Sequence, residues 1–126
     1  MDPKEHEVVF GSFEAMQGEQ INEGYYRRMV NGKNQMVCLV DIRPGWITKS
    51  HKHGNDESMY IVEGDTSCTV GDRTCQLKAG DVIYIPPNVE HELVVGDKGC
   101  RMIKVFSPPR ADFLDGSDRY LRDAKS

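Results

Sequence analysis

The sequence predicts an all-β fold, a barrel or sandwich of short antiparallel strands. Runs of about four to eight residues rich in apolar and β-branched side chains recur along the chain, and pairs of Gly, Pro, Asn or Asp separate them. Long helical patterns between these runs, which would indicate a parallel sheet, are absent. Short strands at regular intervals with turn signals between them are typical of sandwiches and barrels.

Turn signals divide the chain into its expected strands. Asn31-Gly32 is a strong two-residue hairpin signal, because both residues tolerate the positive φ angles of that turn. Further turns are expected at Pro44-Gly45, Gly54-Asn55, Gly64-Asp65, Gly71-Asp72, Ala79-Gly80, Pro86-Pro87-Asn88 and Gly96-Asp97-Lys98-Gly99. The strands between them are expected at 25–30, 35–42, 47–53, 57–63, 66–70, 73–79, 81–85, 92–95 and 100–106.

We treat residues 1–126 as one domain, because a chain of 126 residues has about the length of an average domain. The barrel core is expected over residues 35–106. Residues 1–24 and 107–126 are expected to form arms around it. Helix is expected only near residues 13–18 and 117–123.

The charge balance argues against nucleic acid as a partner. The formal net charge is −4, from 16 basic and 20 acidic residues, and Arg27-Arg28 is the nearest approach to a basic cluster. No stretch is long and apolar enough to span a bilayer, so we expect no membrane partner. The chain does not start with a basic segment followed by an apolar run, which predicts a cytoplasmic protein without a secretory signal.

Cysteine spacing gives no sign of a structural zinc site. Cys38, Cys68, Cys75 and Cys100 include no Cys-x-x-Cys pair, and we expect them to be small buried apolar residues. If Gly71-Asp72 is a hairpin turn, Cys68 and Cys75 face each other across it. A disulfide between those two is possible there but is not required.

Three of the four histidines, together with one glutamate, predict a metal site. His51 and His53 are two residues apart on an expected strand, so both imidazoles point to one face with Cα atoms about 6.5 Å apart. Glu57 follows a turn, and His91 arrives from a distant strand. Three imidazoles and a carboxylate suit one divalent transition metal ion, whether iron, manganese, nickel, copper or zinc. We expect His6, in a polar N-terminal segment, to take no part.

The surrounding residues resemble a known family. The frame Gly45-(five residues)-His51-Lys52-His53-(three residues)-Glu57-(six residues)-Gly64 matches the first cupin motif at every defined position. This resemblance implies a double-stranded β-helix, which is a jelly-roll barrel, with short terminal arms and a bound metal ion.

A second motif resembles the same family with two departures. It reads Gly80-(five residues)-Pro86-Pro87-Asn88-(two residues)-His91. Asn88 stands where the family has glycine, and Asn is the residue after glycine that best tolerates a left-handed backbone. Val95 replaces a polar residue that is not a metal ligand.

Strand alternation predicts the residues around the metal. Met59 and Ile61 share the face of Glu57, and one face of the last strand carries Met102, Lys104 and Phe106. We therefore expect a largely apolar pocket for a small molecule.

An early strand is expected to add polar groups to this pocket. Alternation leaves open which of Tyr25 and Tyr26, and which of Arg27 and Arg28, faces inward. Our assignment places Tyr26 and Arg28 in the pocket.

The segment from Val105 to Leu114 is similar to the C-terminal end of small cupins that ketonise unsaturated uronates. In that family an aspartate, a phenylalanine and an arginine serve the reaction, and the matching positions here are Lys104, Phe106 and Arg110. The aspartate is thus replaced by lysine. Lys104 and Arg110 are our candidate catalytic residues. The alternatives are that Lys104 reaches water at the strand end and that Arg110 pins the C-terminal arm by a salt bridge.

We expect a metal-dependent enzyme that moves protons on a small oxygenated molecule, as an isomerase, lyase or cyclase; a sugar acid is one possible substrate. A dioxygenase on the same site and a non-catalytic ligand-binding or sensing domain are the alternatives. Cupins commonly form homodimers by exchanging N-terminal strands, and residues 8–13 are the candidate segment for such exchange.

Overall fold

The computed structural model describes residues 7–125, so His6 lies outside the described residues. Its elements in order are a 3-10 turn at Phe13–Ala15, β1 Glu19–Asn22, β2 Tyr25–Asn31, β3 Met36–Ile42, β4 Ile47–His51, β5 Asp56–Val70, β6 Arg73–Lys78, β7 Val82–Ile85, β8 His91–Ser107, α1 Ala111–Asp115 and α2 Arg119–Arg122. The prediction of an all-β fold is confirmed.

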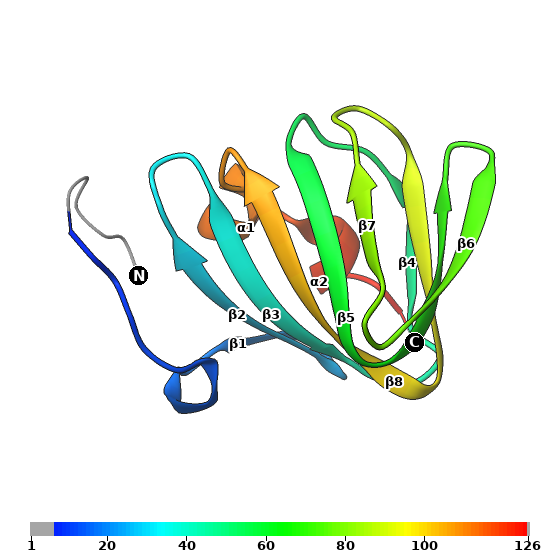
Figure 1. Ribbon diagram of the computed structural model, residues 1–126, viewed down its shortest axis with the longest axis horizontal. Coiled ribbons are helices and arrows are strands. Elements are labelled where there is room, and N and C mark those ends of the chain that lie inside the picture. The colour runs from blue at the N-terminus through cyan, green and yellow to red at the C-terminus, as the bar shows by residue number, and fades with distance from the viewer. Residues whose placement is uncertain (1–6, 126) are drawn as a thin grey trace.

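The strands form an antiparallel sheet that folds over on itself (Figure 1). Its order is β1-β2-β3-β8-β5-β6, with β4 added beside β8 and β7 added beside β5. The first part of β8 pairs with β4 (Val94 with Ile47), and its last part pairs with β3 (Phe106 with Met36). β5 likewise pairs with β7 and then with β6. Two long strands therefore belong to both walls of a jelly-roll barrel.

Two expected turns are bends inside these long strands, so that part of the prediction is wrong. Gly64 lies within β5, and Gly99 lies within β8. The register between β5 and β8 shifts around Gly64, whose φ is 78°. A Cβ on Gly64 would overlap the carbonyl oxygen of Gly99. A glycine permits both the positive φ and this close approach, so the chain changes direction without leaving the ladder.

The hairpin turn at Gly71-Asp72 occurs as expected, between the paired residues Val70 and Arg73. Around this turn, Cys68 and Cys75 are direct cross-strand partners, and both are free thiols. A hairpin also joins β2 to β3, but Asn31 is still part of β2 and pairs with Met36, so the turn spans residues 32–35 and not Asn31-Gly32. Within it, the Gly32 amide donates to the Gln35 carbonyl at 2.8 Å.

The interior between the walls is apolar and closely filled. Val40, Met102 and Ile61 form one row across β3, β8 and β5, and each is fully buried. Burying such side chains contributes about 1.5–3 kcal/mol each, which makes this row a major source of stability.

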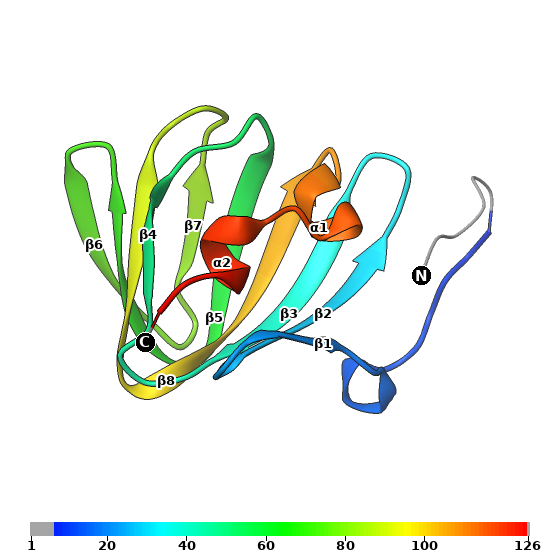
Figure 2. The same cartoon turned by 180° about the vertical axis from the view of Figure 1, so that it is seen from behind.

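The helices α1 and α2 lie together on one side of the barrel (Figure 2). α2 contacts β1 and β4, which lie in different parts of the sheet. The Asn22 side-chain amide donates to the carbonyls of Leu121 and Ala124, at 2.9 and 2.7 Å. β1 falls within the expected N-terminal arm, yet it pairs with β2 and anchors the C-terminal segment. Neither helix in the described chain has the length or apolar character of a membrane span.

Candidate metal centre

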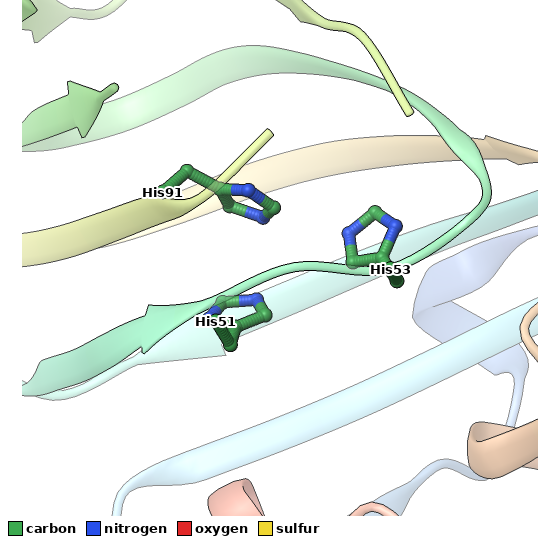
Figure 3. A group of neighbouring side chains, drawn as sticks. All are labelled: His51, His53 and His91. Carbon is green, nitrogen blue, oxygen red and sulfur yellow. The ribbon is translucent and has the colours of Figure 1, made fainter. Parts of the chain in front are cut away.

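Three histidines meet at one end of the barrel (Figure 3). His51 is the last residue of β4, His91 is the first residue of β8, and the two pair across the ladder. One ring nitrogen from each of His51, His53 and His91 lies within 4.8 Å of the others. The structure thus brings together residues that are up to 40 positions apart in the sequence.

His53 does not lie on the strand that carries His51, contrary to the sequence prediction. β4 ends at His51, and the chain then turns toward β5. The backbone of His53 is fixed by the second motif instead, because the Asn88 amide donates to its carbonyl at 2.8 Å. Asn88 has a φ of 63°, the left-handed conformation for which glycine is usual.

Backbone carbonyls set the orientation of two imidazole rings. Nδ1 of His51 donates to the Lys49 carbonyl at 2.8 Å, and Nδ1 of His91 donates to the Val89 carbonyl at 2.9 Å. A carbonyl can only accept, so each ring carries its proton on Nδ1 and presents Nε2 as a lone pair. This is the arrangement by which proteins hold metal-binding histidines.

The nitrogens of this cluster have the properties of metal ligands. His53 Nδ1 and His91 Nε2 are buried, and neither has a hydrogen-bond partner among the described residues. Burial lowers the pKa of His51 to about 4, which keeps its ring neutral and able to donate electrons. Buried polar atoms without partners are rare in proteins, and a metal ion at this cluster would supply a partner for His91 Nε2. His53 faces Glu57 through Nε2, so its unpartnered Nδ1 is not explained in this way.

Glu57 lies beside the three histidines. It is the second residue of β5 and is buried, with Oε1 at 3.0 Å from His53 Nε2 and 3.3 Å from His91 Nε2. Burial acts to raise the pKa of Glu57, but contacts with His53 and His91 and the charge of Lys104 hold it well below its usual range. An ionised carboxylate therefore lies beside the imidazoles, and carboxylate and imidazole groups together suit a divalent transition metal.

The four apolar residues predicted to line the pocket belong to the hydrophobic core, and none of them lines the cleft beside the histidines. The side chains of Met59, Ile61, Met102 and Phe106 are all buried at the interior. The ring of Phe106 stands edge-on to that of His53, with centroids 5.7 Å apart. These four side chains exclude water from the side of the centre that faces the core.

Lys104 lies in the interior and does not extend to solvent. The residue is 7 % exposed, and Nζ is 3.9 Å from Oε2 of Glu57, beyond hydrogen-bond distance. Burial acts to lower the pKa of Lys104, but Tyr25 and Glu57 outweigh it and raise the pKa above the usual value. A protonated ammonium thus lies next to the centre, and it forms no hydrogen bond within residues 7–125.

The assignment of Tyr26 and Arg28 to the pocket is wrong. Along β2 the buried positions are Tyr25 and Arg27, and the intervening side chains point to the other face. Tyr26 accepts a hydrogen bond from the Gly18 amide, and Arg28 lies over its ring. A one-residue difference in phase exchanges the two faces of a strand, so Tyr25 and Arg27 take the inward places.

The C-terminal arm adds residues that the sequence did not indicate. The Tyr120 ring stacks on His51, with centroids 4.5 Å apart and an interplanar angle of 30°. Asp118 and Arg27 form an ion pair at 2.9 Å with side-chain exposures of 0 % and 1 %. Nothing in the local spacing of Tyr120 or Asp118 marks them, because their partners lie far away in the sequence.

Arg110 lies beside this cluster. It is buried, and it pairs with Asp112 through two nitrogens and with the hydroxyl of Tyr120. A cleft of about 620 Å³ is lined by Arg110, Asp112, Tyr120, His51 and His53, among others. Any molecule that enters this cleft meets histidines of the metal centre on one side and the C-terminal arm on the other.

Comparison with known proteins agrees with this architecture. The sequence profile of the Cupin domain matches residues 38–106. The pectin degradation protein KdgF of Dickeya dadantii is 32 % identical over 99 residues, which are 76 % of this chain and 89 % of that protein.

Two solved structures share the fold. An RmlC-like cupin from Shewanella frigidimarina superposes with a TM-score of 0.79 at 30 % identity, covering 87 % of this chain and 99 % of that one. KdgF from Halomonas sp. superposes with a TM-score of 0.80 at 23 % identity, covering 86 % and 100 %.

Proposed function

This chain belongs to the cupin family, and we propose that it is a metal-dependent enzyme that moves protons on a small oxygenated molecule. The observation that carries the proposal is the buried ammonium of Lys104, 3.9 Å from Glu57 and without a hydrogen-bond partner in the described chain. The charge of this ammonium is balanced by Glu57, and its N–H groups remain available as donors. A substrate oxygen that binds beside the histidines can accept a hydrogen bond from it.

In this proposal His51, His53, Glu57 and His91 hold one divalent transition metal ion. When bound, the ion polarises a substrate oxygen and eases the loss of a proton from the adjoining atom. Four protein ligands leave one or two positions for that oxygen. The fit is supported by the unpartnered Nε2 of His91.

Lys104 and Arg110 are the proposed substrate-facing polar groups. The raised pKa of Lys104 keeps it protonated, so it donates a hydrogen bond to a developing oxyanion. Arg110 binds a carboxylate through its planar fork of N–H groups. Met59, Ile61, Met102 and Phe106 exclude water from the reacting atoms.

The relation to KdgF indicates the kind of substrate but not the reaction. The uronate-ketonising cupins that this chain resembles have an aspartate at the position of Lys104. The candidate acid/base group here therefore has the opposite charge. We propose a sugar acid or a similar hydroxy acid as substrate, processed by isomerisation or elimination.

The test has two parts. Protein purified without added metal should contain close to one transition metal ion per chain. In heavy water with a panel of uronates and 2-hydroxy acids, it should exchange substrate C–H protons, as read by NMR. Lys104→Met should keep the metal and lose the exchange. Absence of exchange for every compound, with ligand binding intact, would instead support a non-catalytic binding protein.

A dioxygenase is the second candidate, because apolar side chains make up most of the wall on the core side of the centre. Turnover that stops when oxygen is removed would favour it over proton transfer.

We also propose that the protein forms a homodimer in the cytoplasm. Val8 and Phe10 are 86 % and 93 % exposed, and a neighbouring groove is lined by Phe13, Val30 and Val37. The four cysteines are free thiols, as a reducing compartment would keep them. Phe10→Ser should shift the sedimentation coefficient from dimer to monomer, and a monomeric parent protein would contradict the dimer.

A further inference from the structure

Arg110 is held rigidly at the cleft beside the metal centre. Its guanidinium lies over the rings of Phe113 and Phe106, 4.2 and 5.1 Å from their centroids, and Nη2 donates to the Tyr120 hydroxyl at 3.0 Å. Its side chain is only 4 % exposed. The position of this cation is therefore fixed by packing on several sides.

Asp112 meets Arg110 with the geometry of a bound ligand. Nε donates to Oδ1 at 2.9 Å and Nη2 donates to Oδ2 at 2.7 Å. Two parallel N–H···O bonds are the arrangement by which arginine recognises a free carboxylate. The edge of the guanidinium that would bind a substrate carboxylate is thus occupied by a carboxylate of the same chain.

The two partners differ in how firmly they are held. The side chain of Asp112 is 31 % exposed, against 4 % for Arg110. Asp112 lies in the first turn of α1, which has five residues. Partial burial acts to raise the pKa of Asp112, but the hydrogen bonds from Arg110 lower it, so it stays ionised. Rotating Asp112 toward solvent would leave the packing around Arg110 in place.

Both residues line the cleft with His51 and His53. A molecule that reaches the metal centre through this cleft passes the occupied edge of Arg110. A carboxylate on that molecule can take the place of Asp112 without loss of charge balance, whereas an uncharged group would leave Arg110 unpaired.

We propose that Asp112 is a built-in substitute for a substrate carboxylate, which exchanges with it on Arg110 and so makes the cleft selective for organic anions. The inference rests on the proposed function, since it assigns the substrate class of the same site. Between turnovers Asp112 neutralises the buried guanidinium of Arg110. Only a molecule that carries a carboxylate can replace Asp112 without leaving that guanidinium unpaired.

The test uses glucuronate as the charged probe and glucose as its uncharged counterpart, titrated by calorimetry into the metal-loaded protein. Asp112→Asn should bind glucuronate about tenfold more tightly, because Arg110 no longer has a competing carboxylate. Binding of glucose should change less than about twofold. Asp115→Asn is the matched control, since it removes one negative charge from the same helix outside the cleft and should bind glucuronate as the parent does.

Glucuronate affinity that is equal or weaker in Asp112→Asn, at an unchanged melting temperature, would overturn the exchange and leave Asp112 as a positioning residue for Arg110. An equal gain in glucuronate affinity in Asp115→Asn would mean that the effect comes from net charge, and it would also overturn the proposed exchange. Metal content is measured on the same samples. A low metal content contradicts the proposed function. The ratio of glucuronate affinities between the variants tests the exchange of Asp112 with a carboxylate independently of the metal.

Discussion

The two regions that meet at the metal centre are built in different ways. The barrel supplies His51, Glu57 and His91 from the ends of strands, where the ladder fixes the backbone. The C-terminal arm supplies Arg110 and Tyr120 from two helices of five and four residues. Helices of that length are not stable alone, so the arm depends on its contacts with the barrel.

The difference teaches that metal binding and closure of the cleft have separate physical origins. The ligand cluster depends on the register of a continuous sheet. The arm depends on a few ion pairs and hydrogen bonds to β1 and β2, with Asp118 at their centre. Substitutions should therefore remove either region while leaving much of the other.

The largest expected effect is on the barrel side. His51→Ala removes a ligand and should reduce bound metal, measured by elemental analysis, from near one ion per chain to a trace. Ser50→Ala is the matched control, because Ser50 is exposed and precedes His51 on the same strand. Equal metal content in His51→Ala and the parent would contradict the assignment of the histidine cluster as the metal site.

The second effect tests the arm. Asp118→Asn leaves Arg27 buried without a charged partner and removes a 2.6 Å contact with Arg122, so it should lower the free energy of unfolding by about 3 kcal/mol in urea. Asp123→Asn, at an exposed ion pair with Arg119, should change it by less than about 1 kcal/mol. Loss of metal from folded Asp118→Asn protein would show that the two regions are not separable.

The third effect concerns the ring of Tyr120, which links both regions through its contact with His51. Tyr120→Ala removes the stacking on His51 and should weaken metal affinity about tenfold, measured by competition with a chelator. Tyr120→Phe keeps the ring and should stay within about twofold of the parent. Equal weakening in both variants would assign the effect to the hydroxyl and its bond with Arg110.

The smallest effect is electrostatic and depends on pH. The hydrogen bond from Arg122 lowers the pKa of Glu19 below 4.5, and this pair joins α2 to β1. A lowered pKa in the folded state means that the stabilisation is present above pH 4.5 and is lost as the pH falls through the folded value. Glu19→Gln should therefore be slightly less stable than the parent at neutral pH, and this difference should disappear as the pH falls below the folded-state pKa of Glu19. A stability difference that persists at low pH would contradict the charge-based account.

The barrel side was largely predictable from the sequence, since short-range spacing determines it. His51, His53 and Glu57 lie within seven residues, and the glycine frame around them is specific. The bends at Gly64 and Gly99 were mistaken for turns, because a glycine that kinks a strand and one that ends it look alike in a linear pattern.

The arm side was not predictable, for physical reasons that particular residues show. Tyr25-Tyr26-Arg27-Arg28 presents the same side-chain types to both faces of β2, so its phase cannot be read from composition. Tyr120 and Asp118 act through partners 69 and 91 positions away, His51 and Arg27, and no local pattern reports such contacts.

The continuity of β5 and β8 through both walls has a consequence for how the protein opens. Neither wall can detach as an independent foldon, because each shares two of its strands with the other. Glu57 stands near the start of β5 and His91 at the start of β8, so both shared strands carry a proposed metal ligand. The amide hydrogens of the whole sheet should therefore exchange through a single, global opening event. Metal ligation should slow that one event for residues at the far end of the barrel as much as for those beside the histidines.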